Sequence, residues 1–315
     1  MSKITQHFLQ SPAWQEFQES EGRQTFRLNG SDFDALAILT PTKLGNYLFV
    51  PYGPSVASKI GLNNALEALR SLGTQKNAIF IRIEPLDPLE PSQIAHFNLK
   101  KTKNIEPQAT QILDLTPPAD TILKNFSSTN RNRYRNYAKK GLSTRTSKNP
   151  DDIAILADLL KGVSANNHFT PHAASYLKNQ LKFPFATLYI ADYTDENQKK
   201  TPIAASLVYD DSTTRYYAHA AADYAHRKLS PGNIIVAKMI MDAKDIGKQY
   251  FDFWGITLSE DKTDPWYGFT EFKRSFGGTP KIYAGTYDLV INSAKYHAYT
   301  ALRMINRSFR TFSKR

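Results

Sequence analysis

The sequence contains no cysteine among its 315 residues. This absence excludes disulfide bonds, a thiolate nucleophile and metal centres held by sulfur. Long apolar runs are missing too. A membrane-spanning helix needs about 18 or more apolar residues, and the best candidate, Ile234–Met241, is interrupted by Lys238. The first ten residues have no apolar stretch after Lys3, which argues against a signal peptide. These absences predict a soluble cytoplasmic protein.

Several kinds of active site lack their usual residues. His168 and His172 have the spacing of zinc ligands on one helix face, but Pro171 lies between them and no acidic residue is near. None of the seven histidines lies in a serine-hydrolase nucleophile motif. The loop 227–232 has one glycine, Gly232, where a loop that wraps a pyrophosphate usually has several. We therefore expect neither a metal nor a cofactor.

Positive charge is abundant and unevenly placed. The chain has 40 Lys and Arg against 29 Asp and Glu, a net charge of +11. Two segments, 127–148 and 289–315, contain 13 of these basic residues and no acidic residue, so the rest of the chain is close to neutral. Basic segments attract the phosphates of nucleic acids or lipid headgroups. A solvated helix face explains such a run equally well.

Strand-like and helix-like apolar patterns alternate along the chain, which predicts a mixed α+β fold. A basic helix over 130–140 ends at Gly141, and the first domain is predicted to end there, at about residue 145. The second domain is then 146–289. Within it, Ser230 is predicted as the N-cap of a helix that begins at Pro231.

The most distinctive segment runs from Gly268 to Gly278, just before a predicted strand. Its phenylalanines, Phe269, Phe272 and Phe276, have the spacing of residues that pack into a core, and this packing is one explanation of the segment. Lys273 lies among them, and a cation held beside aromatic rings can stabilise negative charge that develops during a reaction. The residues alone leave both explanations open.

Motifs along nearly the whole chain have the order and spacing of a known family. They are Ser11–Gly22, Pro51–Pro54, Arg82–Pro85, Leu113–Leu115, Asn130–Gly141, Pro202–Ala205, Tyr216–Gly255 and Phe272–Lys273. Together they resemble the Fem family of tRNA-dependent aminoacyltransferases, which add amino acids to the stem peptide of peptidoglycan precursors. The resemblance implies two GNAT-like acyltransferase domains, each a mixed sheet flanked by helices. It also implies that the C-terminal helix, 290–315, returns to complete domain 1 (1–145).

The resemblance implies a reaction as well. A stem-peptide amine attacks the ester carbonyl of aminoacyl-tRNA, the ribose oxygen leaves, and no coenzyme A takes part. Lys273 matches a family lysine near the tRNA end and the tetrahedral intermediate, with Phe272 beside it. The intermediate carries an oxyanion, and one well-placed hydrogen-bond donor to it stabilises it by about 3 to 4 kcal/mol. Glu84 falls where relatives carry a carboxylate suspected as the general base. A structural carboxylate before Pro85 is an equal alternative for Glu84.

For the precursor, the resemblance points to Tyr176 and Trp14 and to three positions at which this chain differs. His172 stands in place of an arginine, His219 in place of a tyrosine, and Glu16 in place of a lysine. These changes leave room for a lipid-linked precursor (lipid II) beside the nucleotide-linked UDP-MurNAc-pentapeptide.

The basic segments are the expected contacts for the tRNA backbone. Arg131, Arg135 and Lys139 are spaced as one helical stripe, with Lys140 beside it. The C-terminal residues Lys295, Arg303, Arg307, Arg310, Lys314 and Arg315 are predicted to face the membrane surface or tRNA. The predicted partners are aminoacyl-tRNA and a peptidoglycan precursor, with peripheral contact at the inner face of the plasma membrane.

Two other functions stay open. One is a coenzyme A-dependent N-acyltransferase on the same fold. The other is a noncatalytic RNA- or membrane-binding module that uses the Arg131–Lys140 face.

Overall fold

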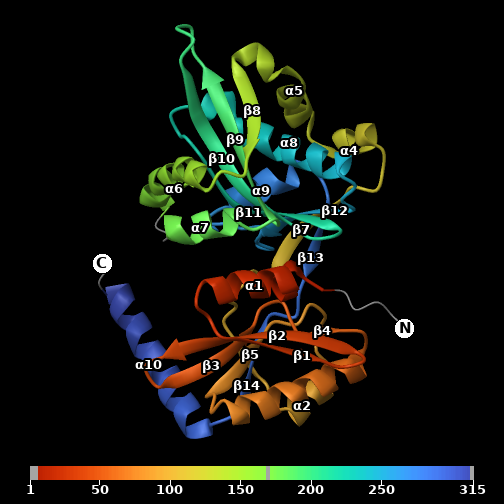
Figure 1. Cartoon of the computed structure of the whole chain (residues 1–315), viewed down its shortest axis with the longest axis vertical. Coiled ribbons are helices and arrows are strands. Elements are labelled where there is room, and N and C mark those ends of the chain that lie inside the picture. Colours follow the sequence, from red (N-terminus) through yellow and green to blue (C-terminus); the bar gives the residue numbers. More distant parts are fainter. Residues whose placement is uncertain (1–5, 168–170, 313–315) are drawn as a thin grey trace. The chain divides into compact units, whose positions relative to one another are not determined.

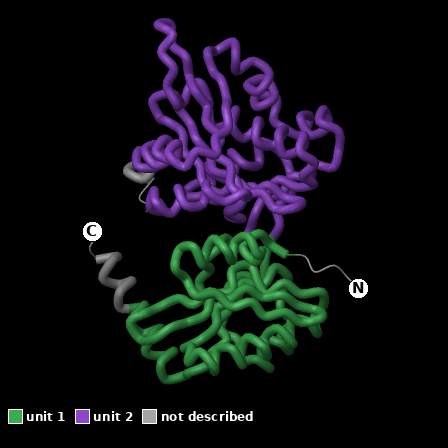
Figure 2. Tube along the Cα trace, viewed as in Figure 1, with its two compact units in different colours: residues 1–108, 282–315 green, residues 109–281 purple. Residues whose placement is uncertain are grey.

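The computed structural model describes residues 6–167 and 171–312, with side chains for 6–163 and 171–304. The chain divides into two compact units (Figure 2). Unit 1 comprises 1–108 and 282–315, and unit 2 comprises 109–281. Unit 2 is therefore an insertion in the sequence of unit 1. The fold class is the expected one, a mixed α+β chain in two units, each a mixed sheet flanked by helices.

Unit 1 is built on a seven-stranded mixed sheet. Its strand order is β1 (Thr25–Asn29), β2 (Phe33–Thr42), β3 (Gly45–Val50), β5 (Phe80–Ile83), β14 (Thr286–Val290) and β6 (Lys100–Thr102), with β4 (Ser55–Val56) paired to β2. β3 and β5 run parallel, and their neighbours run antiparallel. β14 comes from the far end of the chain and lies between β5 and β6.

Helices cover both faces of this sheet (Figure 1). α2 (Lys59–Gln75) lies between β4 and β5 in the chain and buries one apolar stripe, Leu62, Leu66, Leu69 and Leu72, on one face. The 3-10 turn η1 (Phe8–Gln10) and α1 (Pro12–Ser20) lie on the other face. α3 (Pro91–His96) precedes β6.

The C-terminal helix, α10 (Ser293–Phe312), belongs to unit 1. Its Tyr296 and Tyr299 rings lie 5.4 and 5.0 Å from the ring of Phe80 on β5. The predicted return of this helix to the first domain is therefore confirmed.

Unit 2 has a second seven-stranded mixed sheet. Its order is β13 (Thr279–Ile282), β7 (Ala109–Asp114), β12 (Tyr250–Gly255), β11 (Thr214–Ala222), β10 (Lys200–Asp210), β9 (Ala186–Thr194) and β8 (Leu142–Ser147). β11 and β12 are parallel and are joined through η4 (Arg227–Leu229) and α8 (Pro231–Asp245). α8 begins at Pro231 as predicted, but Ser230 is not its side-chain cap. Ser230 is left-handed, with φ of 54°, and its hydroxyl makes no capping bond.

The helices of unit 2 also lie on both faces of the sheet. α8 packs on one face, in a cluster with Val208 of β10 and with Ile122 of α4 (Ala119–Asn125). The next residue of β10, Tyr209, bonds to Gln180 of α7 (Ala174–Leu181). Since successive strand residues point to opposite faces, α7 lies on the face opposite α8. The remaining helical elements of unit 2 are α5 (Ser128–Asn136), η2 (Ala138–Lys140), η3 (Pro150–Asp152), α6 (Ile153–Asn167) and α9 (Tyr267–Arg274).

The division between the units differs from the predicted boundaries, 145/146 and 289/290. It falls at 108/109, because β7 pairs with β12 of unit 2, with Phe251 opposite Leu113. It falls at 281/282, because β14 pairs with β5 and β6 of unit 1. The basic segment 127–148 therefore lies in unit 2.

Candidate active site

Lys273 lies near the end of α9 and is 2% exposed. Its Nζ donates to the carbonyl of Gly255, the last residue of β12, at 2.5 Å. The same atom stands 4.1 Å from the centre of the Phe269 ring and 5.9 Å from that of Tyr217 on β11. Phe269 is itself 49% exposed. A buried cation thus lies under a ring that borders the solvent.

The setting of Lys273 changes its acid–base chemistry. Burial lowers the pKa of Lys273 to about 7, against the attraction of the Asp252 carboxylate. A group with this pKa exists as both ammonium and amine near neutral pH. It can donate a hydrogen bond to an oxyanion in one step and exchange a proton in another. This chemistry suits acyl transfer to an amine, in which an oxyanion forms and the amine loses a proton.

The lysine lies where two parallel strands part. The pairing of β11 with β12 runs from Thr214 opposite Tyr250 to Tyr216 opposite Asp252. Lys273 contacts the residues that follow on both strands, Tyr217 and Gly255. Ligands of α/β sheets bind in such crevices beyond the carboxyl ends of neighbouring strands. The position therefore fits a reacting group.

Phe272, predicted beside Lys273 in the catalytic pair, points into the core. Its ring meets Phe276 edge-on at 5.5 Å and packs against the buried cluster that contains α8. The aromatic residue closest to the Lys273 ammonium is Phe269 instead. Phe272 therefore anchors α9 to the sheet.

Three of the predicted precursor-binding residues lie together in unit 2. The His172 ring stacks on Tyr176 at 5.0 Å and meets His219 edge-on at 5.3 Å. His219 Nε2 lies 2.9 Å from the hydroxyl of Tyr209. Burial, with His172 beside it, lowers the pKa of His219 to about 3, so this imidazole is neutral near pH 7. The cluster offers ring faces and neutral hydrogen-bonding groups.

Glu84 lies in unit 1, directly after β5, and is 3% exposed. Its Oε1 accepts from the backbone N–H groups of Ile105 and Glu106, each at 3.0 Å, and from the Thr286 hydroxyl at 2.7 Å. Burial raises the pKa of Glu84, although these donors oppose the rise. One oxygen that accepts from three donors in the interior is typical of a structural carboxylate. The geometry favours this role over that of a general base.

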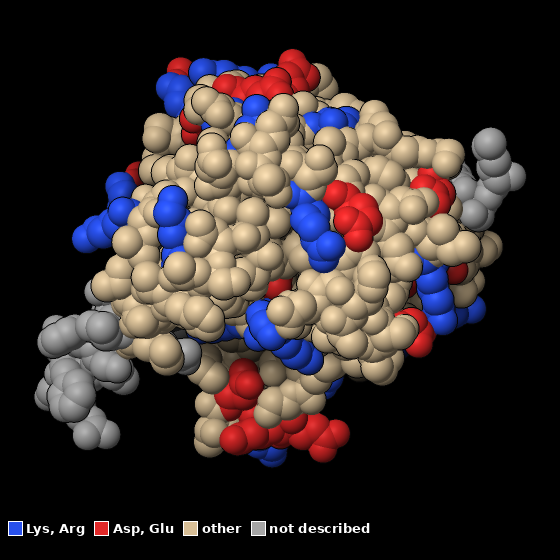
Figure 3. Space-filling view, turned by 90° about the horizontal axis from the view of Figure 1, so that it is seen from below, with Lys and Arg blue, Asp and Glu red and all other residues tan. Residues whose placement is uncertain are grey.

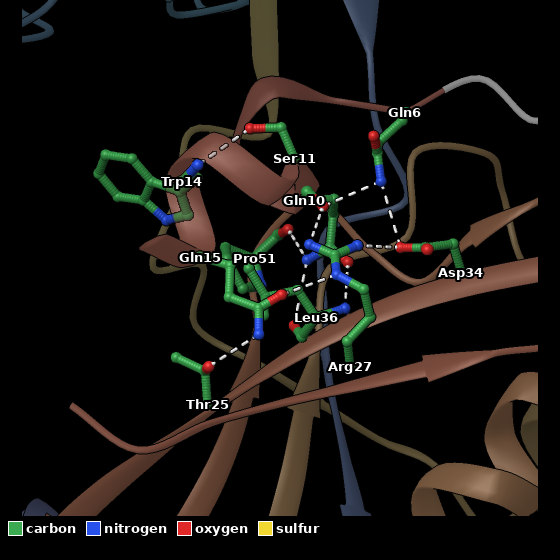
Figure 4. A network of polar contacts seen from close by, with 10 residues as sticks. All are labelled: Gln6, Gln10, Ser11, Trp14, Gln15, Thr25, Arg27, Asp34, Leu36 and Pro51. Carbon is green, nitrogen blue, oxygen red and sulfur yellow. Dashed lines mark hydrogen bonds and ion pairs between the residues drawn. The ribbon is translucent and has the colours of Figure 1, made fainter. Parts of the chain in front are cut away.

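Trp14 and Glu16 both lie on α1 of unit 1, but the side chain of Trp14 is buried and that of Glu16 is exposed. Ser11 caps this helix through Trp14 N at 3.1 Å, and the Trp14 side chain is buried against Phe8 and Phe17. Glu16 is exposed. Figure 4 shows the polar network that fixes the helix: Arg27 bonds to Gln15, to the Gln10 carbonyl and to Asp34. The motif that contains Trp14 therefore builds the fold of unit 1.

The four predicted tRNA contacts divide into two kinds. Arg131 donates to the carbonyls of Lys124 and Phe126 at 2.9 and 2.5 Å, so it caps the end of α4. Arg135, Lys139 and Lys140 are exposed. The predicted single stripe is wrong, because α5 ends at Asn136 and the two lysines follow in the 3-10 turn η2, which has three residues per turn.

The C-terminal basic residues are described in part. Lys295 and Arg303 are exposed, whereas the side chains of Arg307, Arg310, Lys314 and Arg315 lie outside the described residues. The face of the molecule in Figure 3 carries scattered basic and acidic side chains, without a broad area of one sign among the described residues shown there. On this face, basic side chains are therefore interspersed with acidic ones.

Comparison with known families bears on the part of the chain that holds Lys273. Residues 187–304 match the FemAB family model. The match covers less than half of the chain. The resemblance to the Fem family that the motifs predicted is thereby confirmed. The segment runs from β9 to α10 and includes the diverging strands β11 and β12 and the whole of α9.

Solved structures extend the likeness of this Fem-like chain to both units. The crystal structure of FemX superposes with a TM-score of 0.80 at 18% identity, over 93% of this chain and 94% of that chain. The C-terminal domain of a putative lysylphosphatidylglycerol synthetase from Agrobacterium fabrum gives 0.58 at 12% identity, over 91% and 87%. L-PGS from Bacillus licheniformis gives 0.55 at 14% identity, over 90% and 93%. At these identities the likeness establishes the fold. No curated protein matches the sequence significantly.

The sequence did not single out two buried residues that belong to the surroundings of Lys273. Asp252 and Thr110 are 3% and 2% exposed and contact each other through their side chains. Asp252 lies in one of the motifs that carry the resemblance, Tyr216–Gly255, and its position between two phenylalanines was the available signal. Thr110 gave no signal. No helix in the described part of the chain is long and apolar enough to cross a membrane.

Proposed function

We propose that the chain is an acyltransferase that moves an aminoacyl group from aminoacyl-tRNA to an amine on the stem peptide of a peptidoglycan precursor. The observation that carries the proposal is the burial of Lys273 under Phe269, where β11 and β12 part. The match of residues 187–304 to the FemAB family model supports acyl transfer at this position.

The proposed step exchanges one bond for another. The neutral amine attacks the ester carbonyl, the carbonyl oxygen takes the negative charge, and the intermediate collapses with cleavage of the bond to the ribose oxygen. The amine loses one proton and the ribose oxygen gains one, so the step needs no cofactor. Lys273 as ammonium stabilises the oxyanion, an effect worth about 3 to 4 kcal/mol for one well-placed donor.

The remaining assignments belong to the same proposal. The His172, Tyr176 and His219 cluster receives the precursor, and its neutral imidazole suits a head-group whose phosphates are bound elsewhere. We assign the exposed Arg135, Lys139 and Lys140 to the tRNA backbone. Use of a lipid-linked precursor would place the enzyme in the cytoplasm, at the inner face of the membrane.

The test is transfer by the purified protein. Labelled aminoacyl-tRNAs are supplied with lipid II or with UDP-MurNAc-pentapeptide, and the product is identified by mass spectrometry. Lys273→Ala is expected to lower kcat/KM by about 10²- to 10³-fold, while Lys199→Ala, which removes an exposed lysine from the β9–β10 turn, keeps the activity. Absence of transfer from every aminoacyl-tRNA to both precursors sinks the proposal.

Two alternative outcomes identify other functions. Protection from thermal unfolding by coenzyme A, which adds about 2.7 kcal/mol at 100 times its Kd, together with acyl transfer from an acyl-coenzyme A, indicates an N-acyltransferase. Salt-dependent RNA binding without turnover indicates a noncatalytic module.

A further inference from the structure

Strand β12 ends at Gly255, whose carbonyl accepts the hydrogen bond from Lys273. Its backbone bends unusually just before this residue. Trp254 of β12 has a φ of 60°, in the left-handed region that bulky residues seldom occupy. It lies in a bulge, because Phe253 and Trp254 together face a single residue of β7 between the pairs Asp252–Ile112 and Gly255–Thr110. Such a conformation costs free energy and persists where neighbouring groups hold it.

Two buried side chains hold both backbone polar groups of Trp254. The Asp252 carboxylate accepts from Trp254 N at 2.7 Å. The Thr110 hydroxyl, which bonds to the same carboxylate oxygen, lies 2.9 Å from Trp254 O. Its one hydrogen serves one of these two oxygens at a time. Because both side chains are almost fully buried, water does not compete for these bonds.

The bend determines where the next carbonyl points. Gly255 follows Trp254, and its carbonyl accepts the 2.5 Å hydrogen bond from Lys273 Nζ. A second tie fixes α9 to the same stretch of chain, since the buried Thr270 hydroxyl accepts from Thr257 N at 2.9 Å. Rotation of the Trp254 peptide would turn the Gly255 carbonyl away from the ammonium.

We propose that Asp252 and Thr110 are positioning residues, which hold the Trp254 bend so that the Gly255 carbonyl fixes Lys273 Nζ. Neither residue has to touch the substrate in this role. The importance of this positioning role for catalysis rests on the proposed function. The effect of the two residues on the position and the pKa of Lys273 does not depend on that function.

The same pair couples to the protonation of Lys273. Asp252 attracts the ammonium, and the Thr110 hydroxyl favours the charged carboxylate. Lys281 also favours that charge, and the Tyr217 ring is the other titratable group beside the ammonium. Loss of the Thr110 hydroxyl therefore raises the pKa of Asp252 and lowers that of Lys273.

The experiment compares Thr110→Val, Thr110→Ser and Asp252→Asn. The pKa of Lys273 is read by NMR of protein labelled with ε-13C lysine, with the signal assigned through Lys273→Arg, and transfer kinetics are measured alongside. We expect Thr110→Val and Asp252→Asn to lower the pKa of Lys273 and to reduce kcat by roughly 10- to 100-fold, as for a misplaced catalytic group. Thr110→Ser keeps the hydroxyl, so the pKa of Lys273 and kcat should both stay at their wild-type values.

Tyr189→Phe is the matched control. It removes a buried hydroxyl from the same unit, which donates to Asp242 and accepts from Arg215, and it should leave the Lys273 titration and kcat unchanged. An unshifted Lys273 titration in folded Thr110→Val overturns the proposal, even if Asp252→Asn does not fold. A shifted titration in a protein without transfer activity supports the positioning role and rejects the proposed function instead.

Discussion

Each unit contains a pair of parallel strands that are connected through a helix packed on the sheet. The units differ in the backbone at the carboxyl end of the second strand. In unit 1 the pair is β3 and β5, and in unit 2 it is β11 and β12. The chain leaving β5 is tied down at once, because Glu84 N donates to the Gly53 carbonyl at 3.0 Å and the Glu84 carboxylate accepts from three donors. β12 itself bulges at Trp254, after its last pair with β11 and before its end at Gly255.

The buried cations beside these strands differ in the same way. Arg82 of β5 forms two hydrogen bonds with Asp288, at 2.7 and 2.8 Å, and both side chains are almost fully buried. Lys273 meets a carbonyl rather than a carboxylate among the described residues. The cation beside β5 is therefore paired with a carboxylate, whereas Lys273 beside β12 is desolvated without one at hydrogen-bond distance among the described residues. Perturbed charges of the second kind are typical of functional sites.

The sharpest way to break this comparison is Lys273→Met. Burial lowers the pKa of Lys273 from its ordinary 10.5 to about 7, and each unit corresponds to about 1.4 kcal/mol. Removing the buried cation should therefore raise the free energy of unfolding by up to about 4 to 5 kcal/mol at and below pH 7.

The gain from Lys273→Met must depend on pH. Between about pH 7 and 10.5 the unfolded lysine holds a proton that the folded protein releases, so wild-type stability rises with pH and the gain fades. Urea unfolding across this range checks the trend, with exposed Lys199→Met as the control. A gain that does not fall toward high pH contradicts the assignment.

Arg82→Met should have the opposite sign. It leaves Asp288 buried, with the Tyr296 hydroxyl at 3.0 Å but without its cation. Breaking a buried pair in this way costs about 3 to 5 kcal/mol. The measurement is urea unfolding at neutral pH. Arg70→Met, which removes a half-exposed partner of Glu67, should cost about 1 kcal/mol or less, and equal losses for the two variants would argue against the buried pair.

Glu84→Gln separates structure from chemistry in unit 1. The amide keeps one acceptor oxygen for the three donors but places an NH₂ group in the interior, so the free energy of unfolding should fall by about 1 to 3 kcal/mol. Transfer by the folded variant should stay within about twofold of wild type. A general base would instead cost about 10²- to 10⁴-fold in rate, so the kinetic assay decides between the two roles.

The smallest effect is expected on the surface of unit 2. Arg135→Ala removes an exposed cation, so the affinity for tRNA should fall a few-fold and the slope of log affinity against log salt should decrease by roughly one. Filter binding at several salt concentrations measures both quantities. Lys101→Ala, an exposed lysine of unit 1, is the control, and an equal loss in both variants would remove the distinction between the units.

Local sequence patterns predicted the mixed α+β fold class and one residue of the candidate site, Lys273. The start of α8 at Pro231 follows from a local signal, a proline at the first helical position. Lys273 stood out because of the phenylalanines around it. Long-range pairs were beyond such patterns. Thr110 and Asp252 are 142 residues apart and Arg82 and Asp288 are 206 apart, and they meet because of strand register, which no periodicity records.

Strand β14 has a consequence for how the protein is made. It lies between β5 and β6 of unit 1, yet it follows the whole of unit 2 in the chain. Domains usually fold on the ribosome in the order in which they emerge. Here the unit that emerges first lacks the strand between β5 and β6 until residue 290 has been translated, and the edge of β5 stays open for pairing until then. A nascent chain therefore carries a completed second unit on an unfinished first one.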